Sequence, residues 1–302
     1  MVSLLLLLRT AAAQQPPPPP IVNGTETSAW PGVGLLAALD LDQDRGSPFC
    51  SATLVADGAI LTAAHCAEAA EIYAETYDIG FVVGPSIYEI EDYALVDRFT
   101  VHPDYHFDDS GVEADVAVGF LEGSVDAAPI NMLGSGSDWT DATLTVVGYG
   151  LTSDGASDAG TKRTADMPVW FLDQGIVYAL DESDPDSPNA CSGDSGGAAL
   201  RETADGLVLA GVVSFVFSWH DAASACVGGG MGAMRVDEYG DWVASQVDGS
   251  VQTGGSSGSG DNPWMESGKS CASAPGPGPG GLLVGLAALL VGGRRRRVAT
   301  RL

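Results

Sequence analysis

Residues 189–197 read Asn-Ala-Cys-Ser-Gly-Asp-Ser-Gly-Gly, and the interpretation of this 302-residue chain starts from them. Ser195 lies between Gly193 and Gly196, so its hydroxyl can point into the open beside free backbone N–H groups. A nucleophile next to donors for an oxyanion is what an acyl-transfer reaction requires. A plain turn rich in Gly, Ser and Asp has the same composition. The stretch therefore indicates a catalytic site only if further residues support it.

Two segments upstream supply the partners that a serine nucleophile needs. Residues 62–66 read Thr-Ala-Ala-His-Cys and provide His65, because an imidazole is the usual general base for a serine. Asp115 stands before the apolar run Val-Ala-Val at residues 116–118, where it can be buried to orient that imidazole. The order of the three residues along the chain is His, Asp, Ser.

This combination resembles the trypsin/chymotrypsin-like serine proteases (peptidase family S1), which have the same three residues in the same order. The resemblance extends over residues 21–248. It implies an all-β fold of two antiparallel six-stranded β-barrels, with a short C-terminal helix that residues 235–243 introduce. The apolar runs at residues 79–83 and 93–101 are read as two of the strands.

The resemblance also gives each candidate residue a role. Ser195 attacks the scissile carbonyl, His65 takes and returns its proton, and Asp115 orients His65. The backbone N–H groups of Gly193 and Ser195 form the oxyanion hole. The resemblance therefore predicts a serine endopeptidase that acts on proteins or peptides and uses no cofactor. An esterase with the same triad and a catalytically silent binding or adhesion module are the alternatives.

The specificity pocket departs from that of the trypsins. The resemblance places Asn189 at the pocket floor, where a carboxylate would select Arg or Lys by charge pairing. It places Ser214, Phe215 and Val216 along the pocket wall. Without the carboxylate we expect no preference for Arg or Lys. Val216 stands where relatives have glycine, so its branched side chain narrows the pocket mouth and favours small or medium uncharged side chains.

Residues 21–24, Ile-Val-Asn-Gly, match the mature N-terminus of the family. The resemblance implies that cleavage frees the α-ammonium of Ile21, which pairs with Asp194 and orders the oxyanion loop. The bond to be cut is Pro20–Ile21, whereas relatives are usually cut after a basic residue, so the activating protease is not identified. A first strand without any processing is the alternative.

The chain has five cysteines. The resemblance pairs Cys50 with Cys66 beside the histidine, and Cys191 with Cys226 beside the serine. Export would make both disulfides chemically reasonable. Cys271 is left without a partner.

Both ends of the chain resemble export and sorting signals. Residues 1–13 have the apolar run and small residues of a signal peptide, and residues 14–20 form a polyproline pro-segment. Residues 249–270 form a Gly/Ser-rich linker. Residues 271–302 resemble a MYXO-CTERM-type sorting tail, with Cys271, a short apolar stretch and an arginine cluster. That tail implies a membrane processing protease as partner and anchoring at the bacterial cell surface or outer membrane; a plain short membrane anchor is the alternative.

The composition narrows the remaining partners. The formal net charge is −27, which argues against nucleic acid, because binding phosphates needs a basic surface. The acidity favours solubility, with steering of a basic substrate as the alternative. We expect a monomer and no metal site, since Pro103 interrupts the spacing of His102 and His106. Residues 154–162 are polar and glycine-rich, which predicts an exposed loop.

Overall fold

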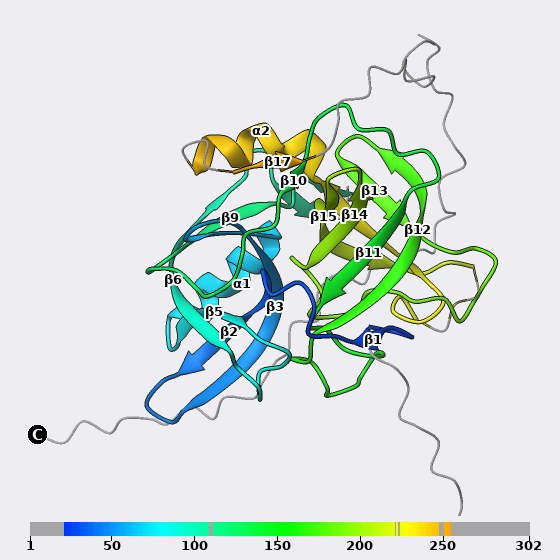
Figure 1. The fold of residues 1–302 in the computed structure, drawn as a ribbon. Helices are drawn as coiled ribbons and strands as arrows, with labels where there is room; N and C mark the ends of the chain where they lie inside the picture. The colour runs from blue at the N-terminus through cyan, green and yellow to red at the C-terminus, as the bar shows by residue number, and fades with distance from the viewer. Residues whose placement is uncertain (1–20, 109–110, 221, 223, 248–250, 255–302) are drawn as a thin grey trace, which may run out of the picture.

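The computed structural model describes residues 21–108, 111–220, 222, 224–247 and 251–254. The proposed signal peptide, pro-segment and sorting tail with Cys271, and most of the linker, lie outside the described residues. Within the described part, two β-barrels lie side by side and one helix packs on each (Figure 1).

Six antiparallel strands form the first barrel, which closes in the order β2-β3-β4-β9-β6-β5. Their bounds are β2 (Val33–Asp40), β3 (Arg45–Ala56), β4 (Ala59–Thr62), β5 (Asp78–Val83), β6 (Asp92–Val101) and β9 (Ala117–Leu121). Leu35, Phe81 and Val118 come from three of these strands and are completely buried in the barrel core. The strands predicted from residues 79–83 and 93–101 are confirmed as β5 and β6.

The second barrel is also six-stranded and antiparallel, and it closes because β14 pairs with both β11 and β15. Its strands are β11 (Thr143–Gly148), β12 (Arg163–Asp173), β13 (Ile176–Ala179), β16 (Gly230–Arg235), β15 (Gly206–Phe217) and β14 (Ala198–Thr203). Leu144, Val177 and Ala199 fill its interior. The predicted fold class of two antiparallel six-stranded barrels is therefore confirmed.

Five short strands complete the sheets. β1 (Thr25–Glu26) pairs with β12, and β7 (His106–Asp108) pairs with β8 (Gly111–Glu113) in a hairpin just before Asp115. β10 (Met132–Leu133) lies parallel to both β15 and β17 (Thr253–Gly254). Residues 253 and 254 of the predicted linker thus belong to the folded domain, because they extend a sheet.

Two helices lie on the barrels. α2 (Val236–Gln246) is the predicted C-terminal helix, and it buries Val236 and Val243. α1 (Ala64–Ala74) was not predicted, although its alanine-rich sequence has high helix propensity. No helix among the described residues is long and apolar enough to cross a membrane.

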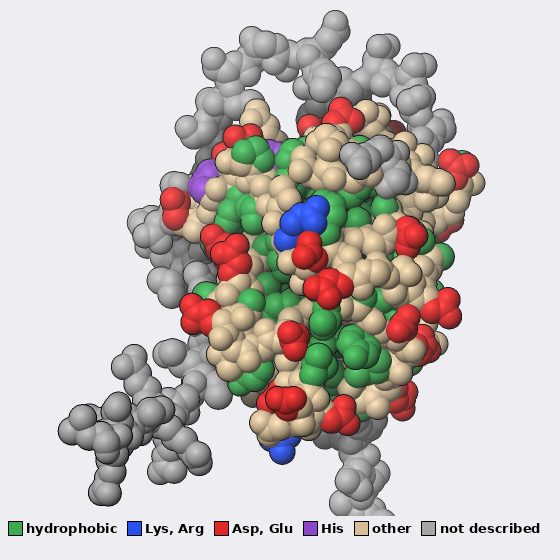
Figure 2. Space-filling view, turned by 90° about the vertical axis from the view of Figure 1, so that its left-hand side faces the viewer, with side chains coloured by type: hydrophobic (Ala, Val, Ile, Leu, Met, Phe, Trp, Pro, Cys, Tyr) green, Lys and Arg blue, Asp and Glu red, His purple; other side chains and the backbone are tan. Residues whose placement is uncertain are grey.

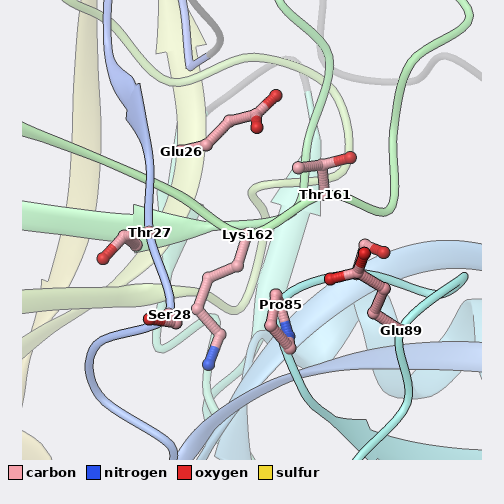
Figure 3. Close-up of a pocket in the computed structure, with 8 residues that line it drawn as sticks. Glu26, Thr27, Ser28, Pro85, Glu89, Thr161 and Lys162 are labelled. Carbon is pink, nitrogen blue, oxygen red and sulfur yellow. The ribbon is translucent and has the colours of Figure 1, made fainter.

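The exposed-loop prediction for residues 154–162 is only partly correct. Asp154 and Gly155 are exposed, but the Lys162 side chain is 1% exposed. Its Nζ donates to the carbonyl oxygen of Trp30 at 3.2 Å, which supplies a buried partner for the charge. Burial lowers the pKa of Lys162 to about 8. The side chain lines a cavity of about 350 Å³ between the N-terminal segment and the loop around Pro85 (Figure 3).

The surface reflects the acidic composition. Figure 2 shows acidic side chains dispersed over the visible face, with very few basic ones among them. Three basic side chains that could offset this charge are largely buried: those of Lys162, Arg163 and Arg235.

Candidate active site

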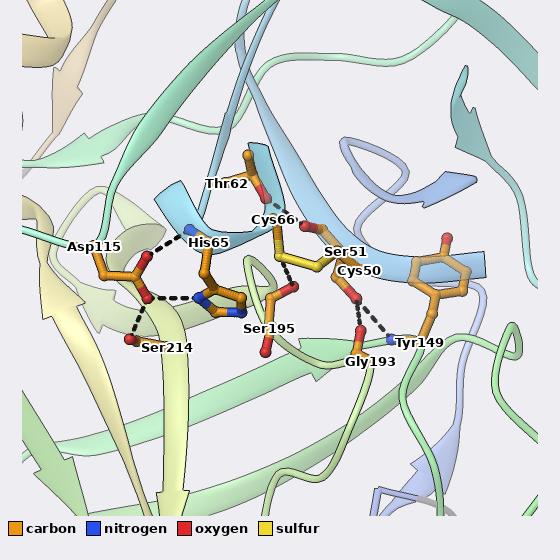
Figure 4. Close-up of a disulfide and its surroundings, with 10 residues drawn as sticks. All are labelled: Cys50, Ser51, Thr62, His65, Cys66, Asp115, Tyr149, Gly193, Ser195 and Ser214. Atoms are coloured by element: carbon orange, nitrogen blue, oxygen red, sulfur yellow. Dashed lines mark hydrogen bonds and ion pairs between the residues drawn. A yellow bond between two sulfur atoms is a disulfide. The ribbon is translucent and has the colours of Figure 1, made fainter. Parts of the chain in front are cut away.

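His65 and Asp115 come from the first barrel and are hydrogen-bonded to each other. His65 lies in the first turn of α1, and Asp115 lies between β8 and β9. Nδ1 of His65 is 2.8 Å from Oδ2 of Asp115, and the backbone N–H of His65 donates to Oδ1 at 2.9 Å (Figure 4). This arrangement determines the orientation of the imidazole and leaves Nε2 free to face Ser195.

The Asp115 carboxylate is completely buried and has a third partner. The hydroxyl of Ser214, on β15, donates to Oδ2 at 2.5 Å. Burial by itself would raise the pKa of Asp115, but the charge of His65 and the hydrogen bonds from His65 and Ser214 outweigh it and lower that pKa. The carboxylate is therefore ionised at neutral pH and can stabilise an imidazolium.

Ser195 lies where the two barrels meet. Its carbonyl oxygen accepts the N–H of Ser51, on β3, while the next residue, Gly196, donates to Val213 on β15. Figure 4 places the Ser195 side chain beside the His65 ring. Within the described residues its hydroxyl makes no hydrogen bond to that ring. Such bonds are often long before a substrate binds.

The backbone around Ser195 presents two unpaired donors. The N–H groups of Asp194, Gly196 and Gly197 all donate to carbonyl oxygens. Those of Gly193 and Ser195 have no acceptor in the described part of the chain. Gly193 has a φ of 96°, and a Cβ there would lie 3.0 Å from the Cα of Gly150. Glycine adopts this backbone conformation without strain. The two N–H groups without an acceptor are those that the sequence predicts for an oxyanion hole.

Asp194 is completely buried behind this loop. Its Oδ1 accepts the N–H of Gly150 at 2.7 Å, and its Oδ2 accepts the N–H of Cys191 at 2.9 Å. Burial raises the pKa of Asp194 to about 6. Ile21 is also completely buried, but no hydrogen bond or ion pair joins it to Asp194 among the described residues. The activation pair predicted from the sequence stays a prediction.

The four expected pocket residues have different environments. The Asn189 amide is completely buried: Nδ2 donates to the carbonyl oxygen of Ala225 at 2.9 Å, and Oδ1 accepts the N–H of Ala190. The polar atoms of the Asn189 side chain are therefore hydrogen-bonded to the backbone. Ser214 is bound to Asp115, whereas Phe215 lies 5.9 Å from the ring of Tyr178. Val216 lies opposite Met231, a residue that the sequence motifs did not single out.

Both disulfides of the described chain have the pairing expected from the sequence. Cys50–Cys66 joins β3 to α1, directly after His65, and Cys191–Cys226 joins the Ser195 loop to the segment before β16. The cluster of potential metal ligands formed by Cys50, His65 and Cys66 has both sulfur atoms in this disulfide, so those atoms are not available to a metal ion.

His102 and His106 have structural contacts. The His102 ring packs 4.7 Å from Trp242 and 5.3 Å from Tyr239 on α2, whereas Nδ1 of His106 lies 3.6 Å from Glu113. Burial lowers the pKa of His102. Each ring thus contacts different residues of the chain, and the His102 ring packs against α2.

The comparisons with known proteins agree with this geometry. The trypsin family model matches residues 21–243. The chain is similar to a trypsin of Saccharopolyspora erythraea, 29% identical over 216 residues that cover 67% of this chain and 88% of the relative. It is also similar to a trypsin of Phaedon cochleariae, 27% identical over 68% of this chain and 81% of the relative. A third relative is the CLIP domain-containing serine protease B15 of Anopheles gambiae, 26% identical over 63% of this chain and 60% of the relative. Because the family model covers most of its length, the chain belongs to the trypsin family and is a serine-type endopeptidase.

Proposed function

We propose that the chain hydrolyses peptide bonds through an acyl-enzyme formed on Ser195. The observation that carries the proposal is the buried Asp115 carboxylate bound to Nδ1 of His65. Beside it lies a serine whose own N–H, like that of Gly193, has no acceptor among the described residues. General base, orienting carboxylate and oxyanion donors lie together around one hydroxyl.

The proposed reaction follows from which atoms of the site are already hydrogen-bonded and which remain available to the substrate. Asp115 keeps the proton of His65 on Nδ1, so Nε2 accepts the proton of Ser195 as Oγ bonds to the scissile carbonyl carbon. The carbonyl oxygen becomes an oxyanion and binds the N–H groups of Gly193 and Ser195. When the C–N bond breaks, His65 returns the proton to the leaving amine. Water then repeats the two steps and releases the acid.

Fluorophosphonate labelling and peptide hydrolysis test this proposal. We expect Ser195→Ala to abolish labelling and to lower kcat by at least about 10⁴-fold, because the nucleophile is lost, with circular dichroism unchanged. Ser135→Ala, at an exposed serine in the turn after β10, is the matched control and should label and cleave like the wild type. Unchanged hydrolysis in Ser195→Ala would contradict the proposal.

The same assay separates the alternatives. A chain that begins at Ile21 and does not label would be a silent binding module, and hydrolysis of esters without peptides would identify an esterase. We further propose that the enzyme does not prefer Arg or Lys, since Asn189 offers no charge for a cationic side chain.

We also propose that the enzyme acts outside the cytoplasm. The two disulfides and the signal-like residues 1–13 support this. Activation at Ile21, processing of residues 271–302 by a membrane protease and attachment through that tail rest on sequence alone. Mass spectrometry of the exported protein tests them: a chain that begins at Ile21 and lacks the tail is expected, and one that keeps residues 14–20 would contradict activation there.

A further inference from the structure

We propose that Arg163 is a positioning residue for catalysis, and that its charge acts on the oxyanion donor Gly193 N–H through two peptide groups in series. The inference rests on the proposed function, because it needs the oxyanion that forms when Ser195 attacks a carbonyl carbon. It assigns a part in the reaction to a residue that no sequence motif includes.

The Arg163 side chain is buried at the start of β12. Its residue pairs with Gly148 of β11, and the side chain is 3% exposed. Nη1 donates to the carbonyl oxygen of Gly150 at 2.8 Å and to that of Asp158 at 3.0 Å. Nη2 lies 3.6 Å from Oδ2 of Asp158, whose side chain is 40% exposed. The shortest of these contacts thus joins a permanent charge to a neutral peptide group.

That peptide group connects Arg163 to the nucleophile loop. It consists of the Gly150 carbonyl, which accepts from Arg163, and the N–H of Leu151. The Leu151 N–H donates to the carbonyl oxygen of Ser192 at 2.9 Å. The Ser192 carbonyl in turn belongs to the same peptide group as the Gly193 N–H. Because the C=O and N–H of a trans peptide group point in opposite directions, the guanidinium and the two peptide groups are linked in series.

A series of this kind strengthens its last donor. Hydrogen bonds in a chain polarise one another, and the effect is larger in a low-dielectric interior. The charge of Arg163 therefore makes the Gly193 N–H a stronger donor. Since that N–H has no acceptor among the described residues, it is available to an oxyanion. A donor directed at developing charge stabilises the transition state more than the bound substrate.

Close packing also ties the position of Gly193 to that of Gly150. A Cβ on Gly193 would lie 3.0 Å from the Cα of Gly150, and a Cβ on Gly150 would lie 2.6 Å from the backbone nitrogen of Asp194. The Gly150 N–H donates to Oδ1 of Asp194 at 2.7 Å. No side chain separates the two segments, so a shift of Gly150 moves the oxyanion donor. Arg163 fixes Gly150 from the side opposite the loop.

The test replaces Arg163 with neutral side chains and follows the oxyanion directly. We expect Arg163→Met to lower kcat for a tetrapeptide p-nitroanilide at least tenfold, with KM within about threefold, because the lost interaction acts only in the transition state. A peptide boronic acid forms a tetrahedral adduct on Ser195 with an oxygen toward the oxyanion donors. Its inhibition constant should rise by the same factor as kcat/KM falls.

Two further variants keep the test decisive. Arg163→Lys retains a cation that can donate to the Gly150 carbonyl, and its kcat should exceed that of Arg163→Met at least threefold. Arg163→Gln has a neutral amide; it serves if Arg163→Met does not fold, and it should lower kcat and boronic acid affinity together. Mass spectrometry checks that all the proteins compared have the same N-terminus, and fluorophosphonate titration gives the concentration of active sites.

Arg235→Met is the matched control. Arg235 is an arginine of the same barrel whose side chain is 14% exposed, and it pairs with Asp237 instead of the nucleophile loop. This variant should reduce stability but leave kcat and boronic acid affinity within twofold. Folded, labelled Arg163 variants with unchanged kcat, or with a lower kcat and unchanged boronic acid affinity, would overturn this inference alone. A wild-type chain that begins at Ile21 and neither labels nor hydrolyses peptides would overturn the proposed function as well.

Discussion

The carboxylate of Asp115 is the most heavily bonded group of the candidate site. It binds the ring and the backbone N–H of His65 and the hydroxyl of Ser214. A buried charge is tolerated only with such partners, so these bonds stabilise the ionised carboxylate and orient the imidazole together. The Asp115→Asn substitution tests the orientation of the imidazole with little change in side-chain volume.

We expect Asp115→Asn to lower kcat by about 10⁴-fold with little change in KM, because an amide N–H facing Nδ1 selects the wrong imidazole tautomer. Steady-state kinetics on one peptide substrate measures the effect. Asp104→Asn, at an exposed carboxylate 4.0 Å from His102, is the control and should leave kcat within twofold. A loss smaller than tenfold in Asp115→Asn would exclude an orienting role.

The first turn of α2 is bound to the second barrel through a buried carboxylate. Asp237 accepts a hydrogen bond from Nε1 of Trp139 at 3.1 Å and another from Nη2 of Arg235 at 2.7 Å. Its side chain is 1% exposed. The negative charge of Asp237 in the first turn also interacts favourably with the dipole of α2.

We expect Asp237→Ala to lower the free energy of unfolding by about 3 kcal/mol, because it leaves the Trp139 and Arg235 donors without their acceptor. Urea unfolding in an inactive Ser195→Ala background measures this without autolysis. Glu238→Ala is the matched control, since Glu238 pairs with the same arginine but its side chain is 52% exposed, and it should cost less than about 1 kcal/mol. Equal losses in the two variants would show that the buried hydrogen bonds contribute nothing.

For the molecule as a whole, the site exists only because the two barrels meet. The first contributes His65 and Asp115, and the second contributes Ser214. Ser51 binds the nucleophile loop across the junction, because its hydroxyl donates to the carbonyl oxygen of Gly193 at 2.9 Å and accepts the N–H of Tyr149 at 3.0 Å. Asp194 is buried behind the same loop, and its predicted pairing with the Ile21 ammonium would couple the state of the N-terminus to stability.

The pH dependence of unfolding should report that coupling. In the uncleaved chain the pKa of Asp194 is about 6, against 3.8 for the ordinary group. Between these values the folded state binds more protons than the unfolded state, so stability falls as pH rises, by about 3 kcal/mol in total. After cleavage the Ile21 ammonium should lower this pKa and remove the decline.

Urea unfolding between pH 4 and pH 7 distinguishes the two forms, again in the Ser195→Ala background. The uncleaved chain should lose stability over this range relative to a chain that begins at Ile21. Asp194→Asn in the uncleaved chain is the control, because an amide does not titrate, and the difference should disappear. Identical profiles for the cleaved and uncleaved chains would contradict pairing between Ile21 and Asp194.

Much of the fold could be predicted because short segments contain the residues that act together. The histidine and serine pentads and their order carry the resemblance to a known family, and that resemblance implied the two antiparallel barrels and both disulfides. Residues 235–243 indicated the C-terminal helix. The α1 helix was not predicted, although its alanine-rich sequence has high helix propensity, because the His65 motif overlaps its first turn. The burial of Lys162 could not be seen, because its carbonyl partners belong to a segment more than 130 residues away.

The environment of the expected specificity-pocket residues could not be predicted from the local sequence. Motifs located Asn189 and Ser214 through Val216, since these lie close to the nucleophile or to each other in the chain. They could not show that Asn189 is bonded to the backbone, or that Met231 lies opposite Val216. The Asn189 amide donates to the carbonyl oxygens of Ala225 and Cys226, which are 36 and 37 residues away in the chain. The register that places Met231 opposite Val216 follows a β-bulge between Val213 and Phe215. One extra residue in a strand exchanges the faces of all the side chains that follow, and only tertiary packing decides where that residue is accommodated.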